Sequence, residues 1–318
     1  MPKIVVSTSS FDVGASSALR ALADSGYEIV TNPFERRLTE AEAVDILRDP
    51  DVVGMIAGTE PLPRATLEKA GALKVISRCG IGMDNVDVVA AGALGIDVLN
   101  TPDAPTDSVA ELTLGLILAA LRRIGEADRA IRAGEWRSLT GGLLRDRVLG
   151  IIGYGRIGRR VGKLADAFGG RVLAYDVREF EPQQHAERTG LDQLLAASDI
   201  VTLHMPSTPH KQAVITAEKL ALMKRRAILV NTSRGDLVDE DALVRALTSG
   251  ALAGAALDTF VKEPYSGPLT TLPQVTLTAH MGSYAEEARA KMEEEAASNL
   301  LHALTARGLV AAACGSAR

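Results

Sequence analysis

The segment VLGIIGYGRIG, residues 148–158, places three glycines directly after an apolar run that is typical of a buried β-strand. Their spacing is Gly153-x-Gly155-x-x-Gly158, and residues 159–168 continue with the apolar periodicity of a helix. The first glycine permits a tight turn, and the last lets the helix pack closely on the strand. A strand, a glycine turn and a helix in this order predict a βαβ unit, which restricts the chain to folds with a parallel sheet.

An acidic residue at the end of the next predicted strand indicates what this turn binds. That strand ends at Asp176, whose carboxylate can accept hydrogen bonds from ribose hydroxyls and would repel a 2′-phosphate. The open middle glycine and the first N–H groups of the helix suit a pyrophosphate. We therefore expect NAD to bind here in preference to NADP, although Arg178 could attract a 2′-phosphate. The predicted contacts of the turn are Gly153, Gly155, Arg156, Ile157 and Gly158.

Short strand-like runs alternate with helical patterns along the whole chain. This order predicts an α/β fold with two Rossmann-like or flavodoxin-like domains, each built on a parallel sheet. One series of strands ends near Asn100 and the second begins near Val148. The predicted strands are residues 3–7, 28–31, 52–57, 73–77, 97–99, 148–153, 171–175, 200–204, 227–231, 255–258 and 275–278.

Two long helices are predicted outside these series. Residues Asp107 to Glu126 are mostly apolar, which favours one buried helix at a domain or subunit interface, with Asp107 or Ser108 as its N-cap. We base the prediction of a homodimer on this helix. Residues 284–307 have apolar residues on one helical face and follow the last strand, so they are expected to lead back to the first domain.

Composition excludes several classes of function. Aromatic residues make up only 3% of the chain, so the core must consist of Ala, Val, Leu and Ile. The net charge of −5 and the lack of a basic stripe argue against a nucleic-acid partner. No apolar run is long enough to span a membrane, and residues 1–10 have no signal-peptide pattern. Cys79 and Cys314 form neither a disulfide framework nor a metal motif. We expect a cytoplasmic protein without a metal.

Three polar side chains follow the later strands of the second series. They are Arg234, Glu263 and His280. Because parallel strands gather ligands at their carboxyl ends, we expect these side chains near the cofactor. Hydride transfer to or from a carbonyl requires an acid or base that exchanges the proton and a cation that stabilises the charge on the oxygen.

The chain contains the segments SRCGIGMDNVD (77–87), NTPDAPTDSVAE (100–111), GYGRIG (153–158), NTSRGDLVDEDAL (231–243), ALDTFVKEP (256–264) and TAHMGSYAEEA (278–288). Together these segments resemble D-isomer-specific 2-hydroxyacid dehydrogenases, in the branch that includes 3-phosphoglycerate dehydrogenase. The chain ends at residue 318, so we expect a short form without the C-terminal regulatory domain of longer members. The resemblance extends over nearly the whole chain.

The resemblance implies catalytic roles for the three polar residues. His280 is expected to protonate the carbonyl oxygen during reduction, and Glu263 to hold the imidazole and favour its protonated form. Arg234 is expected to bind the substrate carboxylate. The expected substrate-binding segment is Arg78, Cys79, Gly80 and Ile81, with backbone N–H groups of residues 79–82 facing the carboxylate. Further cofactor contacts are expected from His204, Met205, Pro206, Thr232, Ser233, Asp258 and Gly282.

The same resemblance implies a domain split in sequence. Residues 1–101 with 288–318 would form the substrate-binding domain, residues 102–287 the NAD-binding Rossmann domain, and an active-site cleft would separate the two. Two positions depart from the family. Ala279 replaces the usual Pro before the catalytic His, and Glu60 lies where phosphoglycerate enzymes tend to have a basic residue. Arg78 or Arg64 could replace that base.

We therefore expect an NAD-dependent oxidoreductase that transfers a hydride between nicotinamide and a small D-2-hydroxy acid or its 2-oxo acid. Phosphate- or phosphonate-bearing acids such as 3-phosphoglycerate are among the candidate substrates. One alternative is a glyoxylate or hydroxypyruvate reductase. Others are oxidation of formate or phosphite, and a non-catalytic protein that senses NAD(H).

Overall fold

The computed structural model describes residues 1–8, 11–181 and 185–310. The chain divides into two compact units, which we call unit 1 (Met1–Pro105 with Ala285–Arg318) and unit 2 (Thr106–Tyr284). The end of the predicted substrate-binding domain, residues 311–318 with Cys314, lies outside the described residues.

Unit 1 is built on a five-stranded sheet in which all neighbouring strands are parallel. The order β2-β1-β3-β4-β5 is that of a flavodoxin-like fold. Its strands are rich in Ile and Val because helices cover both faces, and Ile4, Val5 and Val6 are buried. The strands are β1 (Lys3–Val6), β2 (Glu28–Thr31), β3 (Val52–Ala57), β4 (Val75–Arg78) and β5 (Asp97–Asn100).

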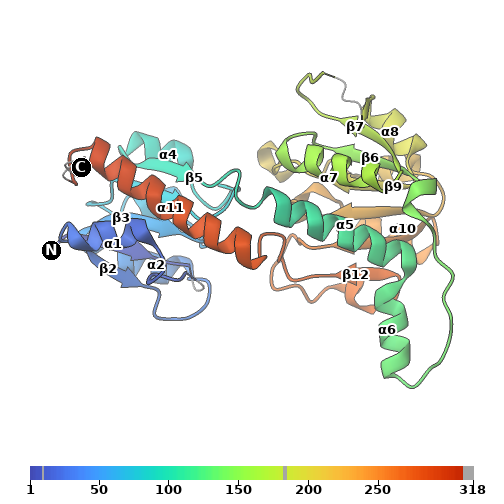
Figure 1. Ribbon diagram of the computed structural model, residues 1–318, viewed down its shortest axis with the longest axis horizontal. Coiled ribbons are helices and arrows are strands. Elements are labelled where there is room, and N and C mark those ends of the chain that lie inside the picture. Colours follow the sequence, from blue (N-terminus) through green and yellow to red (C-terminus); the bar gives the residue numbers. More distant parts are fainter. Residues whose placement is uncertain (9–10, 182–184, 311–318) are drawn as a thin grey trace, which may run out of the picture. The chain divides into compact units, whose positions relative to one another are not determined.

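Helices from both ends of the chain cover this sheet (Figure 1). On one face, α1 (Ser17–Asp24) and α11 (Glu286–Ala306) share an apolar cluster with β1 and β3. On the other face lie α2 (Glu40–Leu47), α3 (Arg64–Leu67) and α4 (Val88–Ala93). The apolar positions of α11 are buried as the sequence predicts, so this helix completes unit 1.

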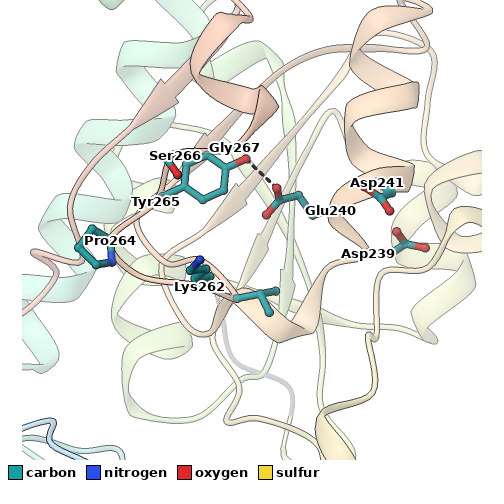
Figure 2. Close-up of a pocket in the computed structure, with 9 residues that line it drawn as sticks. Asp239, Glu240, Asp241, Lys262, Pro264, Tyr265, Ser266 and Gly267 are labelled. Carbon is teal, nitrogen blue, oxygen red and sulfur yellow. Dashed lines mark hydrogen bonds between the residues drawn. The ribbon is translucent and has the colours of Figure 1, made fainter. Parts of the chain in front are cut away.

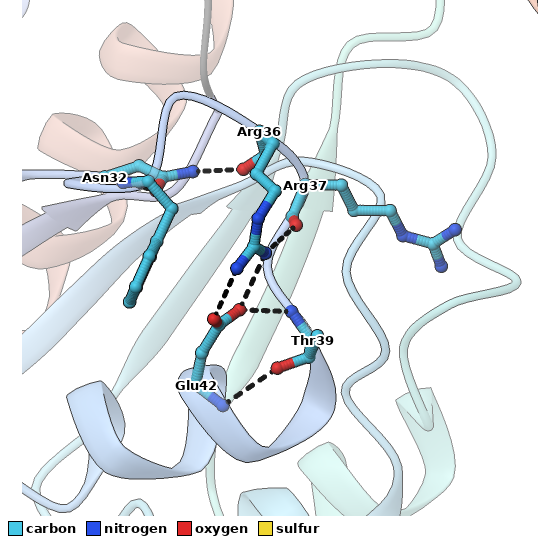
Figure 3. A network of polar contacts seen from close by, with 6 residues as sticks. Asn32, Arg36, Arg37, Thr39 and Glu42 are labelled. Atoms are coloured by element: carbon cyan, nitrogen blue, oxygen red, sulfur yellow. Dashed lines mark hydrogen bonds and ion pairs between the residues drawn. The ribbon is translucent and has the colours of Figure 1, made fainter.

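The start of α2 carries a network of polar contacts (Figure 3). Thr39 caps the helix by accepting a hydrogen bond from the Glu42 N–H at 3.3 Å, and the Glu42 carboxylate accepts one from the Thr39 N–H at 2.8 Å. Arg36 pairs with the same carboxylate at 2.7 Å. The hydrogen bonds from Arg36 and from the Thr39 backbone lower the pKa of Glu42 to about 2. The helix entrance is thus held by a carboxylate that stays charged in mild acid.

Unit 2 contains a seven-stranded sheet, again with all neighbours parallel. In the order β12-β11-β10-β9-β6-β7-β8, the chain turns back after β8 and continues on the other side of β6, which is the Rossmann arrangement. Sequence analysis missed the two-residue strand β8. The strands are β6 (Val148–Ile152), β7 (Arg171–Tyr175), β8 (Glu187–Arg188), β9 (Ile200–Leu203), β10 (Ala227–Asn231), β11 (Leu252–Leu257) and β12 (Val275–Leu277).

The apolar helix predicted over residues 107–126 is two helices in the structure. α5 (Thr106–Arg122) ends where Arg123 takes a left-handed conformation, with φ 55°, and α6 (Ile124–Arg132) follows. Neither predicted N-cap is correct, because α5 already begins at Thr106. Asp107 pairs instead with Arg160, and Ser108 donates to the Gly282 carbonyl at 2.7 Å.

The apolar face of α5 packs inside unit 2. It buries Leu116, Ile117 and Leu121 in one cluster with residues of β6, β10 and α7. Its composition is therefore explained without a subunit interface. Helix α6 and the segment that follows it expose apolar side chains instead, since Ile131 is 57% exposed and Trp136 is 90% exposed.

The remaining helices of unit 2 are α7 (Arg156–Ala167), α8 (Leu191–Ala197), α9 (Ala217–Leu222) and α10 (Glu240–Thr248). A core of Val, Leu, Ile and Ala joins α8, α9 and α10 to the sheet. None of the helices in the described ranges is both long and apolar enough to cross a membrane.

Candidate active site

The sequence-predicted residues of unit 2 share one edge of its sheet. Since all strands are parallel, their carboxyl ends lie together, and the strand order places the segments side by side. The three candidate catalytic residues follow β10, β11 and β12, the last three strands at one side of the sheet. The glycine turn follows β6 and the acidic residue follows β7. In strand order from β7 to β12, the segments carry Asp176, Gly153, His204, Arg234, Glu263 and His280.

The glycine turn has the shape that its sequence predicts. Gly153 has a φ of 92°, and a Cβ atom there would press against the backbone of His204. A Cβ atom on Gly158 would overlap the Gly153 carbonyl oxygen, so packing requires glycine at both positions. Gly155 differs, because a Cβ atom there would meet nothing within 4 Å among the described residues. The space beside Gly155 at the start of α7 is thus left open, which fits a pyrophosphate.

The carboxylate of Asp176 is held directly beside this turn. One oxygen accepts a hydrogen bond from the Tyr154 N–H at 2.7 Å and the other from the Arg178 N–H at 2.9 Å. Each carboxylate oxygen can accept more than one hydrogen bond, so both remain able to accept from ribose hydroxyls. The two backbone contacts fix the position of the negative charge at the end of β7.

His204 follows β9, next to the glycine turn. Its Nε2 atom lies 3.0 Å from the Thr202 hydroxyl, while Nδ1 is buried and has no hydrogen-bond partner among the described residues. Burial lowers the pKa of the imidazole to about 3, so this side chain is neutral at physiological pH. A buried polar atom without a partner is compatible with contact to a cofactor.

The structure brings His280 and Glu263 together from two neighbouring strand ends. The His280 Nδ1 atom lies 2.9 Å and 3.1 Å from the two carboxylate oxygens of Glu263. One of these oxygens also accepts a hydrogen bond from the Phe260 N–H at 3.0 Å. With Nδ1 directed at a carboxylate, the proton of the neutral imidazole is placed on Nδ1, and Nε2 is left for chemistry.

Asp258 holds the segment that carries His280. This buried carboxylate accepts hydrogen bonds from the N–H groups of Met281 and Gly282, both at 2.9 Å, and from the Thr278 hydroxyl at 2.6 Å. The Asp258 carbonyl accepts from the His280 N–H at 2.8 Å. His280 has a left-handed backbone with φ 51°, a conformation that costs free energy unless its surroundings enforce it. The hydrogen bonds to Asp258 hold His280 in this conformation.

Arg234 follows β10, the neighbour of the strand before Glu263. Its turn is organised by the buried Asn231, whose side chain donates to the Arg234 carbonyl at 2.8 Å and accepts from the Ser233 N–H at 3.0 Å. The guanidinium donates to the Ser233 carbonyl at 2.7 Å. The next residue, Gly235, has no room for a Cβ atom because the backbone of Phe260 lies against it. The Arg234 turn and the Glu263 loop are therefore packed together.

Residues 114–282 match the family model described as "D-isomer specific 2-hydroxyacid dehydrogenase, NAD binding domain". The chain belongs to this family. It is accordingly an NAD-dependent D-2-hydroxyacid dehydrogenase with an NAD-binding domain in unit 2, and NAD is its cofactor. Three features of unit 2 fit NAD: the open space at Gly155, the fixed carboxylate of Asp176, and the His204 Nδ1 atom, which has no partner in the described part of the chain.

Relatives of this dehydrogenase carry different names, among them D-3-phosphoglycerate dehydrogenase, glyoxylate reductase and hydroxypyruvate reductase. The D-3-phosphoglycerate dehydrogenase of Methanocaldococcus jannaschii is 45% identical over 79% of this chain, but the match spans only 49% of that relative. The glyoxylate reductase of Thermofilum pendens is 42% identical over 81% of this chain and 79% of its own length. A solved structure titled as a glyoxylate reductase from Paecilomyes thermophila has a TM-score of 0.87 and 30% identity, and covers 97% of both chains.

Two predicted cofactor contacts of the dehydrogenase use their hydroxyls within the fold. Thr232 shares a hydrogen bond of 2.8 Å with Thr113 on α5, and Ser233 donates to the Leu203 carbonyl at 2.6 Å. Both side chains are buried. Their hydroxyl groups therefore hold the turn after β10 against α5 and β9.

The predicted substrate-binding segment lies in unit 1, at the end of β4. The Cys79 N–H donates to the Ala57 carbonyl at 2.9 Å, and the Gly80 N–H donates to the Thr101 hydroxyl at 2.8 Å. These two N–H groups are used inside unit 1, which corrects the expectation that they face a carboxylate. Arg78 donates to the Cys79 carbonyl, and burial raises the pKa of the Cys79 thiol to about 11. Of this segment, Ile81 and Gly82 remain as candidate donors.

Sequence reasoning missed the residues that support the site. Asn231 shapes the turn before Arg234, and Phe260 donates its N–H to Glu263. Tyr265, two residues after Glu263, donates its hydroxyl to Glu240 at 2.7 Å. Each acts through backbone geometry or through a partner distant in sequence. The sequence offers only one signal for them, which is their position within two or three residues of a predicted site residue.

Proposed function

We propose that this dehydrogenase reduces a small 2-oxo acid to the D-2-hydroxy acid, with His280 and Glu263 as its acid–base pair. The observation that carries the proposal is the contact of His280 Nδ1 with both Glu263 oxygens at the edge of the NAD-binding sheet. When bound, NADH supplies the hydride to the carbonyl carbon. The protein must supply the proton and stabilise the charge that develops on the carbonyl oxygen.

The pair is arranged for this proton transfer. Glu263 accepts a hydrogen bond from the Nδ1–H group and stabilises the imidazolium. The Nε2 atom then carries the proton that goes to the carbonyl oxygen. The proton leaves neutral imidazole behind, and the same atom accepts it in the reverse direction. Arg234 is proposed to bind the substrate carboxylate through its planar guanidinium. Ile81 and Gly82 of unit 1 are proposed to add backbone N–H donors.

The side chain of Glu60 in unit 1 affects which substrate we propose. Glu60 is buried at 1% exposure, and it accepts hydrogen bonds from the Ser7 hydroxyl and, at 3.0 Å, from the Gly58 N–H. Gly58 follows β3, the neighbour of β4, so the Glu60 carboxyl group lies at the same sheet edge as residues 78–81. An ionised carboxyl group at this position would oppose the binding of a dianionic phosphate. This supports glyoxylate or hydroxypyruvate over 3-phosphoglycerate, in agreement with the name of the Thermofilum pendens relative.

We propose NAD as the preferred cofactor over NADP, because the fixed Asp176 carboxylate would repel a 2′-phosphate. The need for NADH supports the expected cytoplasmic location.

The proposed homodimer is supported by exposed apolar side chains in α6 and in the segment that follows it. Ile131 is 57% exposed and Trp136 is 90% exposed. A dimer is expected in light scattering, and a monomer at all concentrations would contradict it.

The test is NADH oxidation against a panel of 2-oxo acids that contains glyoxylate, pyruvate, hydroxypyruvate and phosphohydroxypyruvate. Turnover of an acid without phosphate is expected, and His280→Ala should abolish it while NADH still binds. Preferred turnover of the phosphorylated acid would overturn the substrate assignment. Tight NADH binding without turnover of any member would favour an NAD(H)-sensing role instead.

A further inference from the structure

The loop that carries Glu263 is closed by an aromatic pair. The rings of Phe260 and Tyr265, which flank Glu263, are stacked with centroids 4.3 Å apart and an angle of 22° between their planes. The Phe260 N–H donates to the Glu263 carboxylate at 3.0 Å. A shift of either ring would thus change the backbone donor that orients Glu263.

The Tyr265 hydroxyl ties this loop to a separate element. It donates to Glu240, the first residue of α10, at 2.7 Å, and it accepts from the Leu269 N–H at 3.3 Å. Figure 2 shows the Tyr265 hydroxyl directed at the Glu240 carboxylate, with a dashed line between them. The contact joins residues that are far apart in sequence and on different elements.

Packing does not fill the space between the two elements. A cavity of about 410 Å³ lies between the start of α10 and the loop, lined by Asp239, Glu240, Asp241, Val261, Lys262, Pro264, Tyr265, Ser266 and Gly267. Where side chains do not pack, a hydrogen bond contributes more to the position of a loop. The first half of the loop is held differently, since Phe260 lies against Gly235 with no room for a Cβ atom between them.

We propose that Tyr265 is a positioning residue for the acid–base pair, and that its hydrogen bond to Glu240 holds the Glu263 carboxylate on His280. The proposal rests on the proposed function of that pair. Tyr265 does not touch the reacting atoms. It acts through its ring on Phe260, through the Phe260 N–H on Glu263, and through Glu263 on His280.

The Tyr265 hydroxyl remains a donor over the working range of pH. Burial, followed by the hydrogen bond to Glu240, raises the pKa of this phenol to about 12. Besides Glu263, two charged groups belong to the segments next to His280: Asp258, which binds the adjoining backbone, and Arg234 in the turn packed against Phe260. The charged groups on the cavity side are Asp239, Glu240, Asp241 and Lys262. Tyr265→Phe removes none of these charged groups.

The first test is Tyr265→Phe, which keeps the stacked ring and removes only the hydroxyl. We expect kcat/KM for the 2-oxo acid to fall about threefold to tenfold, since a small misplacement of a catalytic group slows proton transfer. A less well held Glu263 stabilises the imidazolium less, so the decline of reduction with rising pH should begin at a lower pH than in the wild type. The Kd of NADH should not change. A wild-type pH profile would overturn the proposal.

The matched control is Tyr27→Phe. Tyr27 is in unit 1, and its hydroxyl donates to the Leu309 carbonyl at 2.5 Å, so this variant also loses a tyrosine hydrogen bond. It should leave the pH profile of reduction unchanged. The same shift in Tyr27→Phe would show that the effect is general destabilisation and would overturn the proposal.

Variants of the acceptor provide a second, independent test. Glu240→Gln keeps an oxygen that can accept from Tyr265 and should retain the wild-type pH profile, whereas Glu240→Ala should behave like Tyr265→Phe. Asp241→Ala removes an adjacent, exposed charge from the same helix turn and should have no effect. The double variant Tyr265→Phe/Glu240→Ala should be no worse than either single one. Additive losses would overturn the proposal.

A measurement without turnover separates this proposal from the proposed function. The imidazole proton signals of His280, assigned with His280→Gln, can be titrated by NMR in the protein without substrate. The midpoint should lie at lower pH in Tyr265→Phe than in the wild type. A shift in an enzyme that reduces no 2-oxo acid would support the positioning role and reject only the proposed substrate. Identical midpoints would overturn the positioning role.

Discussion

The carboxylate of Glu263 faces the Nδ1 atom of His280 with both oxygens, at 2.9 Å and 3.1 Å. A carboxylate in this position stabilises the protonated imidazole and orients its other nitrogen. Glu263→Gln keeps the shape of the side chain and removes its charge. The two residues come from the ends of neighbouring strands, so the contact depends on the order of β11 and β12 in the sheet.

The first prediction concerns this charge. Glu263→Gln should lower kcat for reduction by about 10- to 100-fold, because a neutral amide stabilises the imidazolium poorly. Reduction should also decline at lower pH than in the wild type, since the protonated imidazole is lost earlier as the pH rises. Steady-state kinetics over a range of pH tests both effects. An unchanged pH profile would mean that Glu263 acts only through packing.

A second prediction concerns Asp258. Asp258→Ala leaves the N–H groups of Met281 and Gly282 and the Thr278 hydroxyl without their acceptor in a buried place. Unfolding free energy should fall by about 3 kcal/mol, the order expected when buried donors lose a charged acceptor. Because His280 is no longer enforced in its left-handed conformation, kcat should fall as well. Denaturant unfolding and kinetics measure the two losses, and a stable, fully active variant would contradict this role.

The third prediction tests cofactor choice. Asp176→Ala should raise the KM for NADH and reduce the preference for NADH over NADPH, because a carboxylate that accepts from the ribose and repels a 2′-phosphate is removed. Asp176→Asn is the matched control, since it keeps an acceptor for the Tyr154 N–H but not the charge. If the preference stays the same in both variants, Asp176 does not contact the ribose.

Much of the fold could be predicted from sequence, and so could the position of the candidate site residues at one edge of the sheet. Strand runs such as those of β3 and β10 are apolar and bounded by turn residues, and parallel topology then places the residues after them at one edge. The break between α5 and α6 could not be predicted, because Arg123 is an ordinary helix former and its left-handed conformation depends on tertiary context. The apolar surface of α5 looked like an interface for the same reason, as its partners α7 and β10 come later in the chain.

The supporting contacts of the site were beyond sequence reasoning. Which hydroxyl reaches which carboxylate depends on the distance between loops, as for Tyr265 and Glu240, and no local pattern encodes it. The N–H groups of Cys79 and Gly80 illustrate the same limit. A glycine-containing loop suggests free donors, but Ala57 and Thr101 of neighbouring segments already accept from them.

A fourth prediction concerns acid stability. The pKa of Glu42 is lowered from 4.5 to about 2 by Arg36 and Thr39, so its ionised form favours the folded state. This contribution is fully present above pH 4.5 and is lost as the pH falls toward 2. Arg36→Ala should therefore lower thermal stability at neutral pH slightly, and the difference from the wild type should shrink over that window. A constant difference between pH 5 and 2 would show that Arg36 acts through packing alone.

The last prediction separates folding from cofactor binding at the glycine turn. A Cβ atom on Gly155 meets nothing within 4 Å among the described residues, and its φ of −79° is open to any residue, so Gly155→Ala should fold with wild-type stability. The added methyl group would occupy the space proposed for the pyrophosphate. The Kd of NADH should rise at least about tenfold, the order expected when a close backbone approach is blocked. Gly158→Ala is the contrasting variant, because its Cβ atom overlaps the Gly153 carbonyl and should destabilise the fold itself. Thermal unfolding and NADH fluorescence titration of the two proteins distinguish the roles, and unchanged NADH affinity in Gly155→Ala would place the pyrophosphate elsewhere.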